Sequence, residues 1–223
     1  MLNIAHRGAS GAEPENTLSS FQKAIDLNVD MIEMDIRVCK SGEAIVIHDE
    51  PGNRTTGGRG KVLNKDLDRI KMLDAGSGEE IPTLRESLEL IGGKCLVNIE
   101  LASENSALAT AKVLESFYYM FDSIIISSFL FKELMHLHYL MPTLKLSYLT
   151  DEIRLHNVRE MSRIPLYSIN LNKDFTDKST VQWLHALRFN VFVFTCNTKK
   201  EIDRAKDMGV DGIFTDFPEL FHK

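Results

Sequence analysis

The sequence contains no apolar run long enough to cross a membrane and no dense cluster of basic residues. A transmembrane helix needs roughly 18–20 consecutive apolar residues, and every apolar run in this chain is interrupted by a polar residue well before that length. The formal net charge is −6, whereas proteins that bind nucleic-acid backbones rely on clustered Lys and Arg. We therefore expect neither stable membrane insertion nor a nucleic-acid partner.

Cysteine is also scarce, and Cys39, Cys95 and Cys196 lie far apart in the chain. An odd number of scattered cysteines is typical of reduced thiols in a cytosol and not of a disulfide framework. If Met1 is the true start, there is no room for a secretion signal before His6, at the end of the first predicted strand. We expect a cytoplasmic protein.

What the sequence does contain is a regular alternation of short β-rich runs with helical patterns. This alternation is typical of a parallel sheet whose strands are joined by crossover helices. The predicted strands are Leu2–His6, Met31–Val38, Ala44–His48, Cys95–Leu101, Ser123–Ser127, Leu144–Leu149, Leu166–Asn170, Asn190–Thr195 and Gly212–Thr215. They number nine, one more than an eight-stranded barrel requires.

The short spacing between Met31–Val38 and Ala44–His48 accounts for the extra strand. The segment between them, Cys39–Glu43, is too short for a crossover helix, so we count the two strands as one barrel position with an appended arm. The predicted helices are Thr17–Asn28, Thr83–Ile91, Asn105–Tyr118, Phe129–Leu140, Asp151–Ser162, Lys178–Arg188, Lys199–Met208 and Pro218–Phe221. Eight barrel strands, each followed by a helix, predict a (β/α)8 TIM barrel.

Residues 49–82 interrupt this rhythm with several glycines and one short helical pattern near Asn64–Leu73. We interpret this segment as a small insertion on the rim of the barrel, after the second barrel strand. The expected organisation is a single TIM-barrel domain over residues 1–223.

Carboxylates gather at the ends of two predicted barrel strands. Glu33 and Asp35 are two residues apart on one strand, so both side chains leave the same face, which in a barrel points to the axis. Glu100 ends the next barrel strand. A hard divalent cation with oxygen ligands would offset the repulsion among these acids, and Mg²⁺, Ca²⁺ and Mn²⁺ all suit such a site. Ion pairs with neighbouring Lys or Arg are the alternative.

Two histidines and an arginine occupy similar positions. His6 and His48 each follow an apolar run and suit proton transfer in both directions, since imidazole titrates near neutral pH; the alternative is a histidine that is simply hydrogen-bonded in the core. Arg7 offers a fork of donors for phosphate oxygens, or takes part in an ion pair. Asp49 either orients His48 or caps the loop.

Several stretches together resemble the glycerophosphodiester phosphodiesterase family. They are His6–Ala9, Pro14–Thr17, Asp30–Ile36, Ile45–Asp49, Arg54–Gly57, Ile81–Leu84, Asn98–Glu100 and Gly209–Pro218. The resemblance covers nearly the whole chain in order. It implies a TIM-barrel enzyme that uses a divalent metal to hydrolyse a small-molecule glycerophosphodiester to sn-glycerol 3-phosphate and an alcohol.

The resemblance also implies roles for individual residues. By their matching positions, Glu33, Asp35 and Glu100 would hold the metal. The same matching makes His6 and His48 the acid and base of the reaction. Arg7 would act with them and bind the phosphate.

Two of the positions that depart from the family pattern bear on the site, and a third, Gly52, lies in the rim loop. Ala102 stands where members usually carry a lysine, and Phe194 stands where a tryptophan is common; we interpret Phe194 as an apolar wall for the glycerol or as a packing residue. Both departures leave rate and substrate preference open. The alternatives are a lysophospholipase D-like or phospholipase C-like activity on a lipid, or a barrel that binds phosphodiesters without turning them over. The polar, glycine-rich rim insertion favours a soluble substrate.

Overall fold

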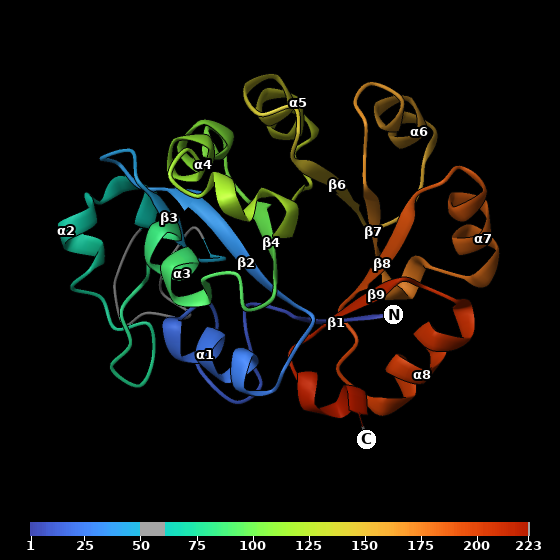
Figure 1. Cartoon of the computed structure of the whole chain (residues 1–223), viewed down its shortest axis with the longest axis horizontal. Helices are drawn as coiled ribbons and strands as arrows, with labels where there is room; N and C mark the ends of the chain where they lie inside the picture. Colours follow the sequence, from blue (N-terminus) through green and yellow to red (C-terminus); the bar gives the residue numbers. More distant parts are fainter. Residues whose placement is uncertain (50–60, 223) are drawn as a thin grey trace.

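The computed structural model describes residues 1–49 and 61–222, so Arg54–Gly57 and most of the glycines of the predicted insertion lie outside the described residues. Within that range, eight parallel strands close into a barrel (Figure 1). The strands are β1 (Leu2–Ala5), β2 (Met31–Val38), β3 (Ala44–Val46), β4 (Leu96–Leu101), β5 (Ile124–Ser128), β6 (Lys145–Thr150), β7 (Ser168–Asn172), β8 (Asn190–Phe194) and β9 (Gly212–Thr215). Pairing of β1 with both β9 and β2 closes the ring, which confirms the predicted fold.

Strand β3 does not belong to the ring. It runs antiparallel to the end of β2, with Ile36 opposite Val46 and Val38 opposite Ala44. The short connection at Cys39–Glu43 therefore makes a hairpin arm, as its length predicts.

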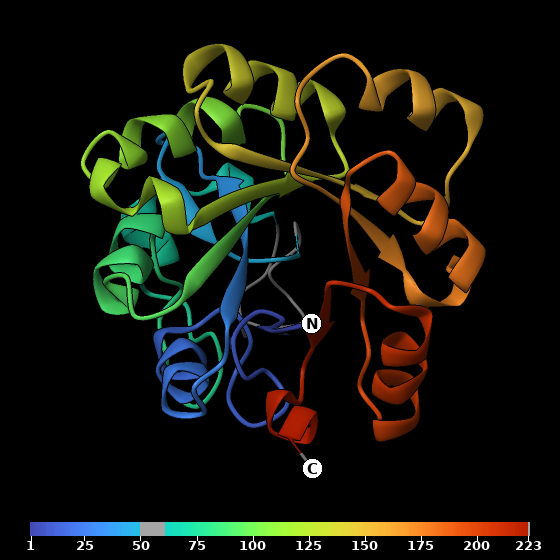
Figure 2. The same cartoon turned by 45° about the vertical axis from the view of Figure 1, so that its right-hand side comes forward.

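Helices surround the barrel on its outside (Figure 2). They are α1 (Leu18–Asp26), α2 (Leu67–Ile70), α3 (Leu84–Ile91), α4 (Ser106–Leu114), α5 (Phe131–Leu140), α6 (Leu155–Met161), α7 (Lys178–Ala186) and α8 (Lys199–Met208), with 3₁₀ turns η1 (Val62–Asn64), η2 (Tyr118–Ser123), η3 (Lys173–Phe175) and η4 (Pro218–His222). Thr17, Thr83 and Thr198 each begin a helix with a capping box, which satisfies free backbone N–H groups at its start.

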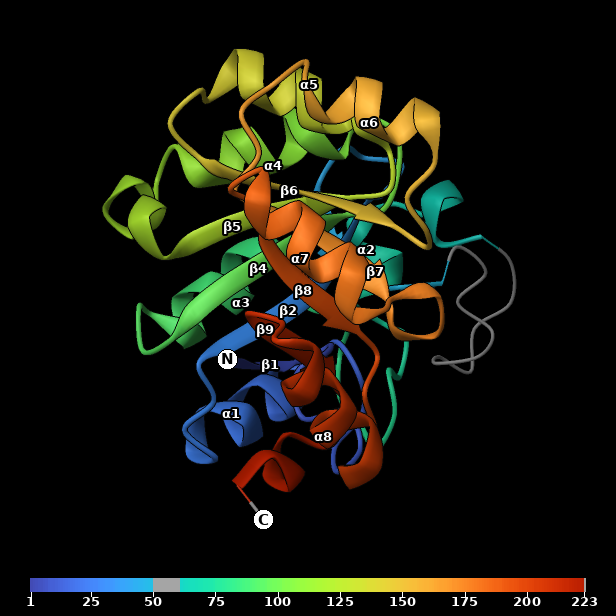
Figure 3. The same cartoon turned by 90° about the vertical axis from the view of Figure 1, so that its right-hand side faces the viewer.

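The last predicted helix, Pro218–Phe221, is a 3₁₀ turn and not an α-helix. Residues after Pro218 form the 3₁₀ turn η4, which contacts β1 and α8 near the C-terminus (Figure 3). Asn3 donates from its side chain to the carbonyl of Pro218 at 3.0 Å. This short turn follows β9 and completes the eighth β/α unit.

Successive side chains of β2 point to opposite faces of the strand, so the apolar core has one part outside the barrel strands and another inside the barrel. Ile32, Met34 and Ile36 point outward into the apolar layer between the strands and the helices. A separate apolar cluster inside the barrel consists of Ile4, Met31, Ile125, Phe192 and Phe214. Met31 lies near the start of β2, so the inward-facing positions beyond it, towards the carboxyl end, are left for polar side chains.

The described part of the rim segment, residues 61–82, packs against the hairpin arm. Buried Val62, Ile70 and Ile81 form a small apolar cluster with Ile45 and Ile47 of the arm and its continuation. Among the described residues, no helix combines the length and apolar character needed to cross a membrane.

Candidate active site

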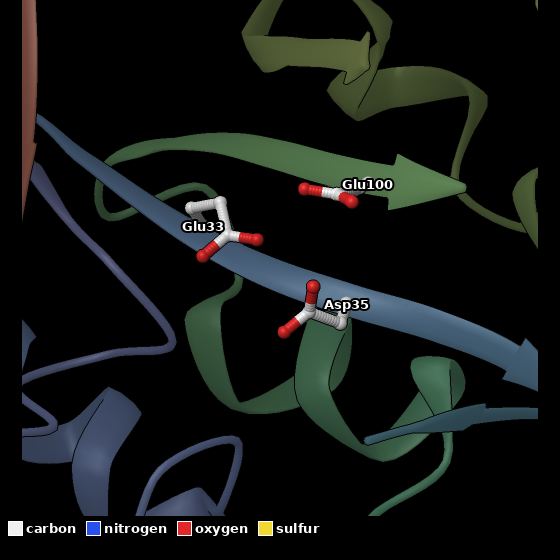
Figure 4. Close-up of side chains that lie close together, drawn as sticks. All are labelled: Glu33, Asp35 and Glu100. Atoms are coloured by element: carbon white, nitrogen blue, oxygen red, sulfur yellow. The ribbon is translucent and has the colours of Figure 1, made fainter. Parts of the chain in front are cut away.

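Three carboxylates lie together between β2 and β4: Glu33 and Asp35 lie midway along β2, and Glu100 lies near the carboxyl end of β4 (Figure 4). Asp35 is paired in register with Glu100, and Glu33 lies one inward-facing position earlier on β2. One oxygen from each residue lies within 4.8 Å of the others. Two oxygens on opposite sides of a cation, each at about 2.4 Å, are about 4.8 Å apart. The three side chains are therefore spaced to contact one ion.

The electrostatics of the cluster favour a bound cation. Burial, followed by the charges of Asp35 and Glu100, raises the pKa of Glu33 well above its ordinary value. Burial and the charge of Asp35 raise the pKa of Glu100 to about 8. Oε1 of Glu33 is a buried acceptor that receives no hydrogen bond from the described protein atoms. A hard cation would satisfy this oxygen and offset the repulsion, so the three carboxylates fit a divalent metal.

Arg7 borders the acidic cluster and is held by it. Its Nε lies 3.2 Å from Asp35, its Nη1 lies 2.9 Å from Glu15, and its backbone N–H donates to Glu33 at 2.8 Å. Burial opposes the charged guanidinium, but the nearby carboxylates of Asp35, Glu33 and Glu15 leave the pKa of Arg7 raised. The side chain therefore keeps its charge beside the site.

The turn after β1 brings Arg7 to this position. Arg7 and Gly8 both have positive φ angles, 58° and 79°. A Cβ atom on Gly8 would lie 2.4 Å from Oγ of Ser20, and the Ser20 hydroxyl donates to the carbonyl of Arg7 at 3.0 Å. The turn needs glycine because α1 passes so close to it.

His6 is held by a carboxylate from the neighbouring strand end. Its Nδ1 lies 2.6 Å from Oδ1 of Asp216, which also accepts a hydrogen bond from the Ser10 hydroxyl at 3.0 Å. The Asn197 amide donates to the other oxygen of Asp216 and accepts from its backbone N–H at 2.9 Å. Burial opposes ionisation of Asp216, but its contacts with His6, Asn197 and Ser10 lower the pKa. With Nδ1 engaged in this way, Nε2 of His6 is the nitrogen left for a substrate.

His48 has a similar partner. Its Nδ1 lies 2.6 Å from Oδ1 of Asp49, so the structure places Asp49 where it orients the imidazole. Nε of Arg37 donates to the backbone carbonyl of His48 at 2.6 Å and ties this residue to β2. His48 is more exposed than His6, with 41% of its side chain accessible against 20%.

One cavity of about 220 Å³ brings most of these groups together. It is lined by His6, Arg7, Glu33, His48, Glu100, Ser127, Phe129, Leu149, Phe194, Thr195 and Phe214. Every predicted site residue except Asp35 lines it, and Asp35 contacts the lining residue Arg7. The opposite wall is apolar: the Phe194 ring stands edge to face with Phe129 and Phe214 at centroid distances of 5.8 and 6.4 Å.

Sequence reasoning did not give roles to Asp216, Asn197 or Phe129. Asp216 follows the last strand, in the same kind of position as the predicted site residues, and that placement was the available signal. Ser127 and Ser128 are not activated nucleophiles, since each hydroxyl donates to a neutral carbonyl oxygen, that of Asn98 or Leu101.

A closed parallel barrel with acids, histidines and an arginine around one cavity at its carboxyl ends has the architecture of a TIM-barrel enzyme. The sequence profile of the glycerophosphoryl diester phosphodiesterase family matches residues 6–220. The chain belongs to this family, and its predicted resemblance and enzyme class are confirmed.

Relatives and solved structures agree with this assignment. The glycerophosphodiester phosphodiesterase of Caldanaerobacter subterraneus is 37% identical over 98% of this chain and 95% of the relative. That of Bacillus altitudinis is 37% identical over 97% of this chain and 94% of the relative. A phosphodiesterase from Oleispira antarctica, solved with the product sn-glycerol-3-phosphate, has a TM-score of 0.91 and 28% identity, and the match covers 98% of this chain and 94% of that one.

Proposed function

We propose that this chain hydrolyses small glycerophosphodiesters to sn-glycerol 3-phosphate and an alcohol by acid–base catalysis with His6 and His48. The observation that carries the proposal is the single cavity that joins both histidines, Arg7 and the acidic cluster. The product bound by the Oleispira antarctica enzyme supports this substrate class. A soluble diester is the expected partner, without nucleic acid or membrane insertion.

Glu33, Asp35 and Glu100 would hold a divalent cation, which we expect to be Mg²⁺, Ca²⁺ or Mn²⁺. When bound, the cation would polarise a phosphoryl oxygen and offset developing negative charge. Treatment with a chelator should abolish activity, and adding back each metal in turn should identify those that restore it. The melting temperature should rise with the same metals, because a ligand of the folded state stabilises it. Full activity in excess chelator would contradict this assignment.

Arg7 would bind the phosphate, because its guanidinium lines the cavity and is held in place by Asp35 and Glu15. Phe194 would provide an apolar wall for the glycerol carbons, because its ring lines the same cavity on the side opposite the acids. This arrangement orients the diester with its charged oxygens toward β2 and its carbon skeleton toward β8.

The described side chains that line the cavity include no activated nucleophile, so we propose that the substrate's own hydroxyl attacks. Nε2 of His6 takes the proton from the glycerol hydroxyl next to the ester carbon as its oxygen bonds to phosphorus. The bond from phosphorus to the alcohol breaks, and His48 donates a proton to the departing oxygen. Water then opens the cyclic phosphate, with His48 as base and His6 as acid.

A diester that lacks this hydroxyl tests the mechanism directly. The analogue should bind but remain intact, because the only attacking group would have been removed. Hydrolysis of the analogue at the rate of the natural diester would mean that water attacks phosphorus directly.

A lysophospholipase D-like activity is a second candidate, favoured by one observation. Phe129, which lines the cavity, is 45% exposed, and the next residue, Leu130, is 40% exposed. Parallel turnover of glycerophosphocholine and a lysophosphatidylcholine of the same headgroup decides between the two. We expect the soluble diester to be hydrolysed faster.

We also propose a cytoplasmic location and a single catalytic domain. Cys39, Cys95 and Cys196 are free thiols, and burial raises the pKa of Cys95 and of Cys196 to about 11. Neutral, reduced thiols suit a reducing compartment. Fractionation of the source cells, followed by detection of the protein in the soluble fraction, tests the location.

A further inference from the structure

A second cavity, of about 270 Å³, adjoins the first at the carboxyl end of β6. It is lined by Phe129, Tyr148, Leu149, Thr150, Asp151, Glu152, Arg154 and Asn157. Phe129 and Leu149 line both cavities, so the two spaces meet across these side chains. A phosphodiester whose phosphate lies beside His6 and Arg7 could extend one of its two ester arms into this second space.

Among the described residues that line the second cavity, the charges of Asp151, Glu152 and Arg154 sum to a net negative charge. Arg154 pairs with Glu152 through both its Nε and its Nη2. Asp151 instead accepts a hydrogen bond from the neutral amide of Asn172 at 3.1 Å. Asp151 is exposed, and Arg154, the one cation among the described lining residues, is already paired with Glu152.

The neutral donors of this cavity are already engaged within the protein. The Tyr148 hydroxyl donates to Glu160 at 2.6 Å, and the Thr150 hydroxyl donates to the carbonyl of Glu152 at 2.9 Å. The buried amide of Asn157 donates to the hydroxyl oxygens of both Tyr148 and Thr150. A neutral polyol needs donors as well as acceptors from its site, and these side chains offer it few donors. Among the described lining residues, the groups left to contact a ligand are the carboxylate of Asp151 and the aromatic ring of Phe129.

The aromatic ring is that of Phe129, which stands between the two cavities and is 45% exposed. Its edge-to-face contact with Phe194, at 5.8 Å between centroids, holds its orientation. An aromatic face together with a nearby carboxylate is the combination that recognises ammonium groups, including quaternary ones. Anionic alcohols would meet the uncompensated charge of Asp151 instead.

We propose that the second cavity binds the alcohol part of the diester and selects alcohols that carry an ammonium group. This inference rests on the proposed diesterase function, because it extends the same substrate from the first cavity into the second. Asp151 and Phe129 are specificity-determining residues in this arrangement. They determine which alcohol is preferred, whereas His6 and His48 in the first cavity carry out the proton transfers of the reaction.

The test compares two diesters that differ only in charge: glycerophosphocholine and its neutral isostere with a 3,3-dimethylbutyl alcohol. The wild-type enzyme should prefer the charged diester in kcat/KM by about threefold to thirtyfold, the range for a partly exposed ion pair combined with a cation–π contact. Asp151→Asn should remove most of this preference and leave kcat/KM for the neutral isostere within about twofold of wild type.

Phe129→Leu serves as a second variant, since it keeps apolar bulk and removes the aromatic face. Compared with wild type, this variant alone should lower the preference for the charged diester by a few-fold. Asp203→Asn, which removes an exposed carboxylate from α8, is the matched control and should leave the preference unchanged. Unchanged melting temperatures would show that the variants are folded.

The outcomes separate this inference from the function on which it rests. Hydrolysis of both diesters with a ratio that neither Asp151→Asn nor Phe129→Leu changes would overturn the ammonium site alone. An equal loss on both diesters would also overturn it, because the variant would then affect the reaction and not the choice of alcohol. No hydrolysis of either diester by the wild-type enzyme would overturn the diesterase function and the inference together.

Discussion

Replacing Asp216 by Asn is expected to remove the proton-accepting role of His6 while leaving the fold intact. In the structure, Oδ1 of Asp216 lies 2.6 Å from Nδ1 of His6. A carboxylate can only accept there, so Nδ1 carries the hydrogen and Nε2 of the neutral ring is free to take a proton. Asp216 therefore sets the tautomer that the proposed mechanism requires.

The contacts of Asn197 determine how an asparagine at position 216 would sit. Oδ1 of Asn197 accepts from the backbone N–H of residue 216 at 2.9 Å, so its amide nitrogen must face the side chain of that residue. The oxygen of the new amide would stay on the Asn197 side, and its NH₂ group would face His6. An NH₂ donor opposite Nδ1 moves the ring hydrogen to Nε2, where the base is needed.

The expected loss follows from the role of a general base. Such a group typically contributes about 10²- to 10⁴-fold to rate, so kcat for Asp216→Asn should fall within that range. KM should change little, since Arg7 and the apolar wall remain in place. Release of sn-glycerol 3-phosphate, coupled to its dehydrogenase, measures both constants. The melting temperature of the variant should stay close to that of wild type.

Asp211→Asn provides a matched control. Asp211 also lies opposite a histidine, with its Oδ2 2.8 Å from Nε2 of His185, but neither residue lines the catalytic cavity. This variant should retain wild-type kcat. If Asp216→Asn were folded and within about twofold of wild-type kcat, His6 would not act as a base through this tautomer.

Three further substitutions test other parts of the structure. Arg7→Lys should lower kcat/KM by roughly tenfold to a thousandfold, measured with the same assay, because an ammonium cannot form two parallel bonds to phosphate; unchanged kinetics would assign Arg7 to an ion pair alone. Gly8→Ala should lower the free energy of unfolding, measured in urea, by about 2 kcal/mol or more, since its Cβ would clash with Ser20. Gly42 also has a positive φ but open space around it, so Gly42→Ala should lower the free energy of unfolding by less. Glu33→Gln should abolish the metal-dependent rise in melting temperature and stabilise the metal-free protein, because it removes a repelled buried charge; a metal-dependent rise equal to that of wild type would exclude Glu33 as a ligand.

The fold could be predicted because each barrel strand and helix follows a local pattern. Hydrophobic periodicity identified the strands, and the short segment Cys39–Glu43 was enough to separate the β3 arm from the ring. The nature of the last element was missed: residues after Pro218 form a 3₁₀ turn because the chain closes there against β1 and α8. That closure depends on tertiary contacts, which local periodicity does not contain.

The candidate site shows the same division. Glu33 and Asp35 could be placed on one face because a strand has a period of two. The contact between His6 and Asp216 could not be predicted in this way. It depends on the exact register of β1 on β9, in which Ala5 lies beside Thr215. The second cavity was missed for a related reason, since Phe129 and Asp151 follow different strands and line one cavity only once β5 and β6 are paired.

The barrel separates the groups that stabilise it from the groups that react. Near the start of β2, Met31 packs with Ile4 and Phe192 in a fully buried apolar cluster. Two and four residues later, the same face carries Glu33 and Asp35, whose mutual repulsion opposes folding unless a cation is bound. Burial of the apolar clusters offsets this repulsion. Neither the cluster inside the barrel nor the one between the strands and the helices includes the acids. A charge cluster suited to phosphodiester chemistry can therefore persist at one end of a barrel that is stabilised by apolar residues at its other end and between its strands and helices.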